Sequence, residues 1–312
     1  MMCLKFPEKP LLAFIITIPE LWTDPLMTLK FLPSLLFSFL FISSSYALDG
    51  DMYDFFLPNG LKVIMMEKHA APKVAVMLGY NVGSHDEVEG QKGITNLIKE
   101  ITNKGTSKYP KVKVDKIKEE LQAKYDDGVS LDRTFFITEI PIENIEFALD
   151  LESDRMQNII VSEETLSNSK IKIKTKYSSW RNNNPIDAAF TDVFLKMFPE
   201  GHPYRTGSWG ILEQVDTLSI HTCQHYYNTY FSPNNAAIII VGDIVPEDVT
   251  KLIYQYFSGL TPTKDIPPDP NLSVNDIPDK VIQRHIDAFE AEIYFSLIGV
   301  NFFTPSTRHD DA

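Results

Sequence analysis

The sequence GITNLIKEITNKGT, from Gly93 to Thr106, carries the strongest structural signal in this chain. Its apolar residues recur at intervals of three and four, which predicts a short amphipathic helix. These residues are Ile94, Leu97, Ile98 and Ile101. The polar residues at the same spacing on the other side are Asn96, Lys99, Glu100 and Asn103. Gly105 then stands where a glycine commonly ends a helix.

The flanking chain alternates between predicted strands and helices. A hairpin is expected around the turn Pro58-Asn59-Gly60, followed by a strand over Val74–Tyr80. An acidic, glycine-containing loop, NVGSHDEVEGQKG, then leads to the helix. Further predicted helices cover Tyr109–Asp126, Ile145–Asn158, Ser162–Trp180, a segment starting at Leu218, and Glu247–Phe257. Asp126–Gly128 is expected to turn the chain, and strands are expected over Val129–Ile140 and Ala236–Val241.

Several of these stretches together resemble one known family. VGSHDEVEGQKGITNLIKEITNKGT is similar to the active-site helix of the insulinase, pitrilysin and mitochondrial processing peptidase family. LPNGLKVI before it, and His202-Pro203-Tyr204 and YFSPNNAAIIIVGD after it, match the same family. The resemblance runs from about Tyr53 to Leu260. It implies an α+β fold in which a mixed, mostly antiparallel sheet is packed with helices, as in processing peptidases.

The resemblance also implies a zinc site, because this family carries the inverted motif His-x-x-Glu-His on the helix. On this chain the first ligand histidine corresponds to Asn96, the general base to Lys99 and the second histidine to Glu100. The family's third ligand, a glutamate ahead of an Asn-x-Pro element, corresponds to Lys176. Zn²⁺ binding needs neutral imidazole, thiolate or carboxylate ligands. We therefore expect no zinc cofactor, no metal ligand and no catalytic residue at these four positions.

Glu100 and Lys176 correspond to two ligands that would face each other across a metal. We hypothesise that they form an ion pair, since a buried carboxylate or ammonium without a partner is costly. The alternative is that the polar side of the helix is solvated. His69 and His85 flank the predicted strands, and a lone histidine in a loop is more typical of a solvated side chain than of a ligand.

Composition narrows the classes of partner. The 312 residues are 44% hydrophobic and 23% charged, which is ordinary for a globular protein. With 42 acidic and 29 basic side chains, the formal charge is −13, which argues against nucleic acid and against anionic membranes as partners. The two cysteines, Cys3 and Cys223, imply no disulfide framework.

The N-terminal residues 1–47 read as an extension with a signal peptide. From Met27, the sequence MTLKFLPSLLFSFLFISSSYALDG has a lysine, an apolar core and a Ser-Tyr-Ala cleavage site. We expect cleavage after Ala47, export to the periplasm or the exterior, and no stable membrane span afterwards. Met27 is a candidate for the true start. An uncleaved anchor is the alternative, although the apolar run is shorter than the roughly 20 residues that span a bilayer.

The predicted domain organisation places a peptidase-like module at residues 48–260. Thr261–Asp279 is rich in Pro and Asp and reads as a linker. Residues 280–312 read as the truncated start of a second module, with a strand over Ile286–Phe303. An unpaired apolar strand there would be an aggregation liability, so a partner chain or a truncated reading frame is expected.

These features together predict a catalytically inactive homologue of the zinc metallopeptidases. The resemblance implies a non-catalytic subunit, or a peptide-binding partner, of an active homologous peptidase. One alternative is an active metalloendopeptidase with a rearranged site that uses Glu100, His69 or His85. Another is a decaying gene product without a function.

Overall fold

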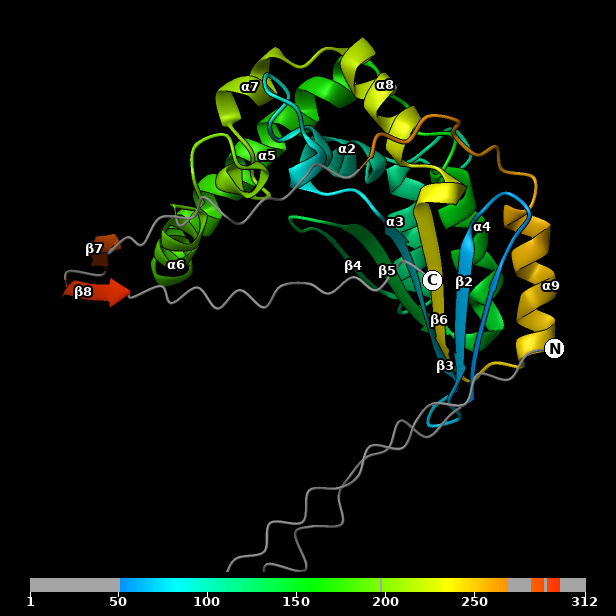
Figure 1. Cartoon of the computed structure of the whole chain (residues 1–312). Helices are drawn as coiled ribbons and strands as arrows, with labels where there is room; N and C mark the ends of the chain where they lie inside the picture. The colour runs from blue at the N-terminus through cyan, green and yellow to red at the C-terminus, as the bar shows by residue number, and fades with distance from the viewer. Residues whose placement is uncertain (1–50, 197, 269–281, 289–290, 298–312) are drawn as a thin grey trace, which may run out of the picture. The chain divides into compact units, whose positions relative to one another are not determined.

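A six-stranded sheet forms the centre of the fold (Figure 1). The computed structural model describes residues 51–196, 198–268, 282–288 and 291–297. The strands lie in the order β1-β2-β6-β3-β5-β4. They are β1 (Met52–Phe56), β2 (Lys62–Glu67), β3 (Lys73–Tyr80), β4 (Lys124–Val129), β5 (Thr134–Pro141) and β6 (Ala236–Gly242). Only β2 and β6 pair in parallel within this sheet, so the predicted mixed, mostly antiparallel α+β fold is confirmed.

The strands form where apolar residues alternate with a period of two. In β3 and β5 every second residue is buried, and the residues between them are mostly half-buried. Val76, Leu78 and Phe136 therefore point to the same core. β6 lies inside the sheet, and its Ile238 and Ile240 are completely buried.

The helices supply the other half of this core. They are α2 (Ile94–Thr102), α3 (Lys111–Glu120), α4 (Ile145–Arg155), α5 (Glu163–Asn183), α6 (Pro185–Lys196), α7 (Leu212–Thr217), α8 (Ile220–Tyr230) and α9 (Pro246–Phe257). Short 3₁₀ turns are η1 (Ser84–Asp86), η2 (Ile142–Asn144), η3 (Pro203–Thr206) and η4 (Pro233–Asn235). Leu97 of α2, Leu149 of α4 and Phe257 of α9 are fully buried in one cluster with the strand residues. Within the described residues, no helix has both the length and the apolar character needed to cross a membrane.

Glycines set both ends of α2. Gly93 precedes the helix with φ +101°, and a Cβ there would lie 2.5 Å from the Val215 side chain. Gly105 follows the helix with φ +91°, and a Cβ there would collide with the Tyr109 carbonyl. Both positions thus need a residue that tolerates the left-handed region and close backbone approach. The predicted helix end at Gly105 is confirmed.

The region after α2 differs from the prediction in two ways. The predicted helix Tyr109–Asp126 is wrong at both ends, because α3 stops at Glu120 and Gln122 has φ +50°. The predicted turn at Asp126–Gly128 is also wrong, since these residues lie within β4. The predicted single strand Val129–Ile140 therefore gives way to a β4–β5 hairpin. Its turn is closed by a 2.8 Å hydrogen bond from Ser130 N to the Arg133 carbonyl.

The other predicted elements are present with small shifts at their ends. The hairpin around Pro58–Gly60 pairs β1 with β2. Near the C-terminus the predicted strand Ile286–Phe303 is wrong as a single strand. Two antiparallel strands, β7 (Ile282–Ala288) and β8 (Ala291–Leu297), pair with each other instead, with Ala288 opposite Ala291; residues 298–303 of the predicted strand lie outside the described residues. The signal peptide within residues 1–47 lies outside the described residues, as does the linker after residue 268; residues 261–268 form no helix or strand.

Candidate functional site

The polar side of α2 is buried. Asn96 is 6% exposed, Lys99 7% and Glu100 0%, because α5 and β4 pack over this side of the helix. A solvated helix side, the alternative left open by the sequence, is therefore wrong. Each polar group on this side needs a partner within the protein, since an unpaired buried charge costs several kcal/mol.

Glu100 lies at the centre of a cluster of charged side chains. Lys176 Nζ, from α5, donates a hydrogen bond to Glu100 Oε1, which confirms the predicted ion pair. Lys172 Nζ, one turn earlier on α5, lies 2.7 Å from Glu100 Oε2. Burial by itself would raise the pKa of Glu100, but Lys99, Lys172 and Lys176 outweigh it and hold this pKa at about 2. Glu100 is consequently an anion at all ordinary pH values.

Lys99 joins the cluster to the sheet. Its Nζ lies 3.1 Å from Glu100 Oε1 and 2.9 Å from Asp127 Oδ2 on β4. Burial lowers the pKa of Lys99, but the carboxylates of Glu100 and Asp127 raise it by more. The pKa of Lys99 is therefore above its usual value. Lys99 is thus a protonated cation with no free lone pair, which cannot accept a proton. Lys99, Lys172 and Asp127 were not predicted as members of this cluster, although Lys172 precedes Lys176 by one helical turn.

The donor set does not fit a zinc ion. Asn96 Nδ2 donates a hydrogen bond of 3.4 Å to the Ser208 carbonyl, and Glu100 is surrounded by three ammonium groups. An ammonium offers no lone pair and repels a divalent cation. Among the described residues, no three His, Cys, Asp or Glu side chains gather as metal ligands would.

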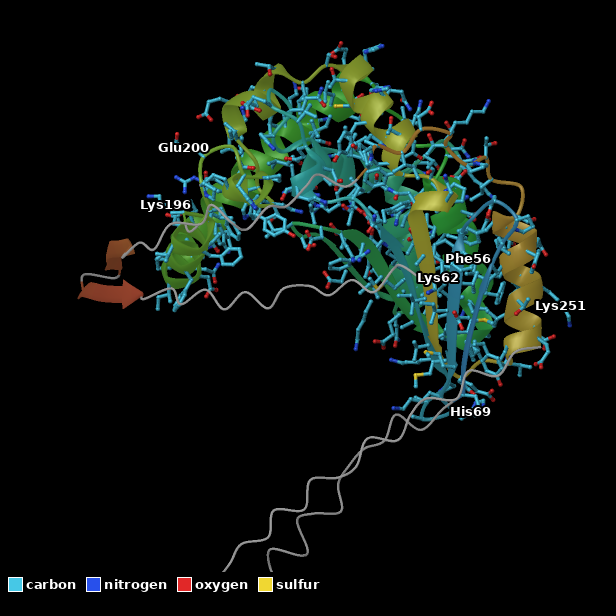
Figure 2. The ribbon with its side chains drawn as sticks, viewed as in Figure 1. Phe56, Lys62, His69, Lys196, Glu200 and Lys251 are labelled. Atoms are coloured by element: carbon cyan, nitrogen blue, oxygen red, sulfur yellow. The ribbon has the colours of Figure 1, made fainter. Side chains whose placement is uncertain are left out.

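The two histidines considered for a rearranged site have other partners. His69 is exposed, with its Nε2 2.5 Å from Glu67 Oε1 and its Nδ1 bonded to Asp243. Figure 2 shows it at the end of the sheet away from α2. His85 is buried, so the expectation of a solvated side chain is wrong there. Its Nδ1 contacts the Leu131 carbonyl at 2.8 Å, because the loop before α2 packs on the β4–β5 turn.

Glu87 is a buried acid that the sequence prediction missed. Its carboxylate accepts hydrogen bonds from Gly93 N at 2.7 Å and Thr95 N at 2.9 Å, so it caps the N-terminus of α2. Desolvation nevertheless raises its pKa to about 7, although these hydrogen bonds and Lys92 oppose the rise. The sequence signal that could have indicated this cap is an acidic residue six positions before the glycine at the start of the helix.

Glu87 gives the chain a pH-dependent stability that can be measured. Its folded pKa of about 7 lies above the usual 4.5, so the folded state binds more protons between these values. The resulting stabilisation is fully present below pH 4.5 and is lost as the pH rises to 7, by up to about 3 kcal/mol. We expect urea unfolding of Glu87→Gln to lack this decline. The exposed Glu89→Gln variant should retain it, and equal pH slopes in all three proteins would contradict the assignment.

An aromatic cluster adjoins the charged cluster on the same helix. Tyr177 and Trp180 of α5 pack against Trp209, with ring centroids 5.6 and 5.7 Å from the Trp209 ring. Trp209 follows Ser208, whose carbonyl binds Asn96. Charged and aromatic side chains thus lie side by side on α5.

Comparison with known proteins identifies the family. The sequence model of the insulinase family (peptidase family M16) matches residues 62–198, and the model of the peptidase M16 inactive domain matches residues 218–312. The chain belongs to the insulinase family. The match includes all of α2 and α5, so the charged cluster lies in the region matched by the insulinase (peptidase family M16) model.

Three relatives show how far the similarity extends. The chain is similar to zinc protease PqqE of Helicobacter pylori, with 23% identity over 206 residues covering 65% of this chain and 46% of that protein. It is 22% identical over 207 residues to a mitochondrial-processing peptidase subunit beta of Caenorhabditis elegans. This match covers 65% of this chain and 44% of that protein. The crystal structure of the periplasmic protease PqqL from Escherichia coli matches with a TM-score of 0.64 and 18% identity. The match covers 75% of this chain and 26% of that chain. The chain spans less than half the length of each of these proteins.

Proposed function

We propose that this chain is a catalytically inactive insulinase-family protein that acts as a peptide-binding, non-catalytic partner of an active peptidase. The observation that carries the proposal is the position of Glu100. Its carboxylate is completely buried and surrounded by Lys99, Lys172 and Lys176, where the family places its metal ligands.

Zinc peptidases of this family need a metal-bound water and a base that takes its proton. The residue at the base position here is Lys99, which is held protonated by Glu100 and Asp127. The residues at the ligand positions are an amide, a carboxylate paired with ammonium groups, and an ammonium. Hydrolysis by the family's route has neither its nucleophile nor its base in this arrangement.

Peptide binding is supported by the edge of the sheet next to this cluster. β4 is an edge strand, and its Asp127 contacts Lys99 of α2. An extended peptide can add to such an edge through main-chain hydrogen bonds. One relative is named as a subunit of a processing peptidase, which supports a role beside a second chain. The E. coli relative is described as periplasmic, which supports the proposed export through a signal cleaved after Ala47.

The first test measures zinc and cleavage in the full chain. After incubation with zinc chloride and gel filtration, mass spectrometry is expected to find no stoichiometric zinc. An unfolded peptide is expected to remain uncleaved while binding to the chain in a fluorescence anisotropy titration. One tightly held zinc with cleavage, both lost in Glu100→Gln, would instead support the active enzyme with a rearranged site. A chain with no cooperative unfolding transition would support a decayed gene product.

The partner role needs its own measurement. Light scattering of the chain mixed with a zinc-bearing insulinase-family chain from the same genome is expected to show a one-to-one complex. Two separate species at micromolar concentrations would contradict the partner role but leave peptide binding intact.

A further inference from the structure

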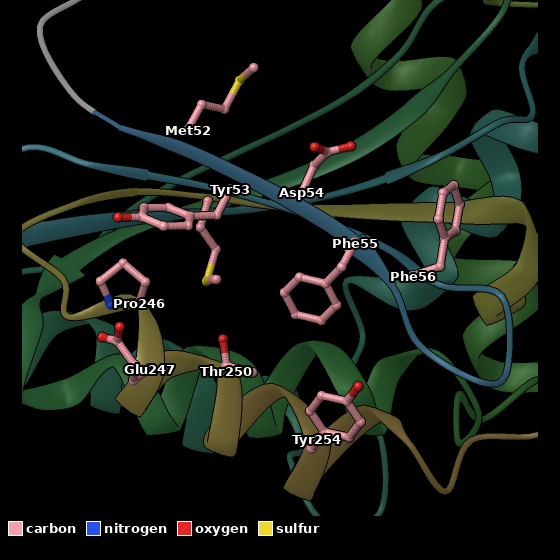
Figure 3. Close-up of a pocket in the computed structure, with 10 residues that line it drawn as sticks. Met52, Tyr53, Asp54, Phe55, Phe56, Pro246, Glu247, Thr250 and Tyr254 are labelled. Atoms are coloured by element: carbon pink, nitrogen blue, oxygen red, sulfur yellow. The ribbon is translucent and has the colours of Figure 1, made fainter. Parts of the chain in front are cut away.

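A pocket of about 770 Å³ lies between β1 and α9, at the edge of the sheet opposite β4 (Figure 3). The strand contributes Tyr53 and Phe55, whose side chains point toward the helix in Figure 3. The helix contributes Glu247, Thr250 and Tyr254. This pocket shares no residue with the charged cluster around Glu100, so its function is a separate question.

In the part of the chain that the structure describes, no strand pairs with the outer edge of β1 beside this pocket. The Asp51 carbonyl accepts a 3.4 Å hydrogen bond from Glu67 N, and Met52 stands opposite Met66 in the register. Because hydrogen-bonded pairs alternate along an antiparallel ladder, the backbone groups of Tyr53 and Phe55 face β2. Those of Met52, Asp54 and Phe56 face outward, where an added strand would find them.

The side chains around this edge are apolar and exposed. Met52 is 71% exposed, Phe56 64% and Tyr254 43%. Phe55 stacks on Tyr254 with ring centroids 6.2 Å apart and planes 7° from parallel, which gives the pocket a flat aromatic floor. Apolar groups of this size on a strand edge favour contact with another chain.

Carboxylates make one end of the pocket negatively charged. Glu247 lines it from the helix, and Asp51 and Glu67 lie near Tyr53, whereas the Asp54 carboxylate lies on the side of β1 away from α9 (Figure 3). Desolvation raises the pKa of Tyr53, and the nearby carboxylates of Asp51, Glu67 and Glu247 raise it further.

The cations near the pocket have other partners. The Lys62 ammonium lies over the Phe56 ring at 5.7 Å, at the other end of β1 (Figure 2). Lys251 is paired with Asp248 at 2.8 Å. The end of the pocket near Tyr53 is therefore acidic.

We propose that the β1–α9 pocket binds an extended peptide of alternating apolar and basic residues, which adds to β1 as a further strand. The outward backbone groups of Met52, Asp54 and Phe56 supply the hydrogen bonds. Apolar side chains of the peptide lie on the helix side and contact Phe55 and Tyr254. Its basic residues then lie on the other side of the added strand, beside Asp54, and Glu247 attracts them at longer range.

A second copy of this chain fits the edge less well. A twofold pairing of β1 centred on Asp54 would set two Asp54 carboxylates directly opposite each other. The formal charge of −13 adds repulsion between copies. The charge of the site thus selects a basic partner over self-association.

The test uses the full chain and fluorescein-labelled peptides of alternating valine and lysine. We expect the lysine peptide to bind at least tenfold tighter than a valine–glutamate peptide of the same length, and more weakly in high salt. N-methylation of the peptide backbone on its pairing edge is expected to abolish binding, which requires no change to the protein. Equal binding of the lysine and glutamate peptides, or binding that survives N-methylation, would overturn the proposal.

Variants locate the binding on the chain. Asp54→Pro removes an outward N–H and is expected to weaken binding at least tenfold, whereas Asp54→Asn should have a smaller effect. Glu247→Lys is expected to weaken binding severalfold, while the neighbouring Asp248→Lys, which makes the same charge change outside the pocket, should weaken it less. Unchanged binding by a folded Asp54→Pro chain would overturn the site. Concentration-dependent dimerisation that Asp54→Pro abolishes would overturn the choice of occupant.

Discussion

A chain carrying Asn96→His, Glu100→His and Lys176→Glu is expected to hold one zinc ion. Positions 96 and 100 are one helical turn apart on the same side of α2, and Lys176 Nζ already contacts Glu100. The three side chains therefore converge, and the substitutions replace an amide, a carboxylate and an ammonium by two imidazoles and a carboxylate. Such a ligand set binds zinc with about 10 kcal/mol or more when its geometry is tetrahedral.

Zinc content after dialysis and competition with a chelator would measure this effect. The matched control carries Lys170→Glu in place of Lys176→Glu, because Lys170 lies on the same helix and donates to the Asp216 and Leu218 carbonyls instead. We expect tight zinc in the first chain and at least hundredfold weaker binding in the control. A folded triple variant that holds no zinc would mean that the three positions do not converge as the structure places them.

Arg155→Met is expected to lower the free energy of unfolding by about 3–5 kcal/mol, the largest stability effect expected for a single charged residue here. Arg155 and Glu152 are 3% and 1% exposed, and Arg155 Nη1 lies 2.9 Å from Glu152 Oε1. Arg155 also donates to the Tyr125 hydroxyl, which in turn donates to Asn103 at the end of α2. Without the guanidinium, Glu152 would be a buried carboxylate that keeps only the weaker attraction of Lys118, whose pKa burial and Arg155 lower to about 8 in the unchanged protein.

Urea unfolding of four variants isolates the ion pair: Arg155→Met, Glu152→Leu, their double variant and Lys111→Met. The double variant Glu152→Leu with Arg155→Met removes both charges and is expected to be more stable than Arg155→Met alone. Lys111→Met breaks the exposed pair with Asp115 and is expected to cost less than about 1 kcal/mol. If the double variant loses as much unfolding free energy as the two single variants lose together, the cost does not come from the unpaired charge.

The sequence predicted those elements whose signal is local. The spacing of Ile94, Leu97 and Ile98 and the glycine at 105 were sufficient for α2. The alternation in β3 and the Pro-Asn-Gly turn were sufficient for the first strands. β4 was missed because KYDDGV is polar and contains a typical turn pair, Asp-Gly. It is a strand because its backbone pairs with β5, and that pairing depends on residues outside the segment.

The same distinction holds for the candidate site. The loss of the motif residues, and the ion pair between Glu100 and Lys176, followed from the aligned positions in the family. The rest of the charged cluster did not, because Lys172 reaches Glu100 from α5, and Asp127 reaches Lys99 from β4, only after these elements pack on α2. Spacing within one helix constrains which side chains share a face. Contacts between residues 76 positions apart, such as Glu100 and Lys176, and the burial that makes them strong, arise from the packing of the whole domain.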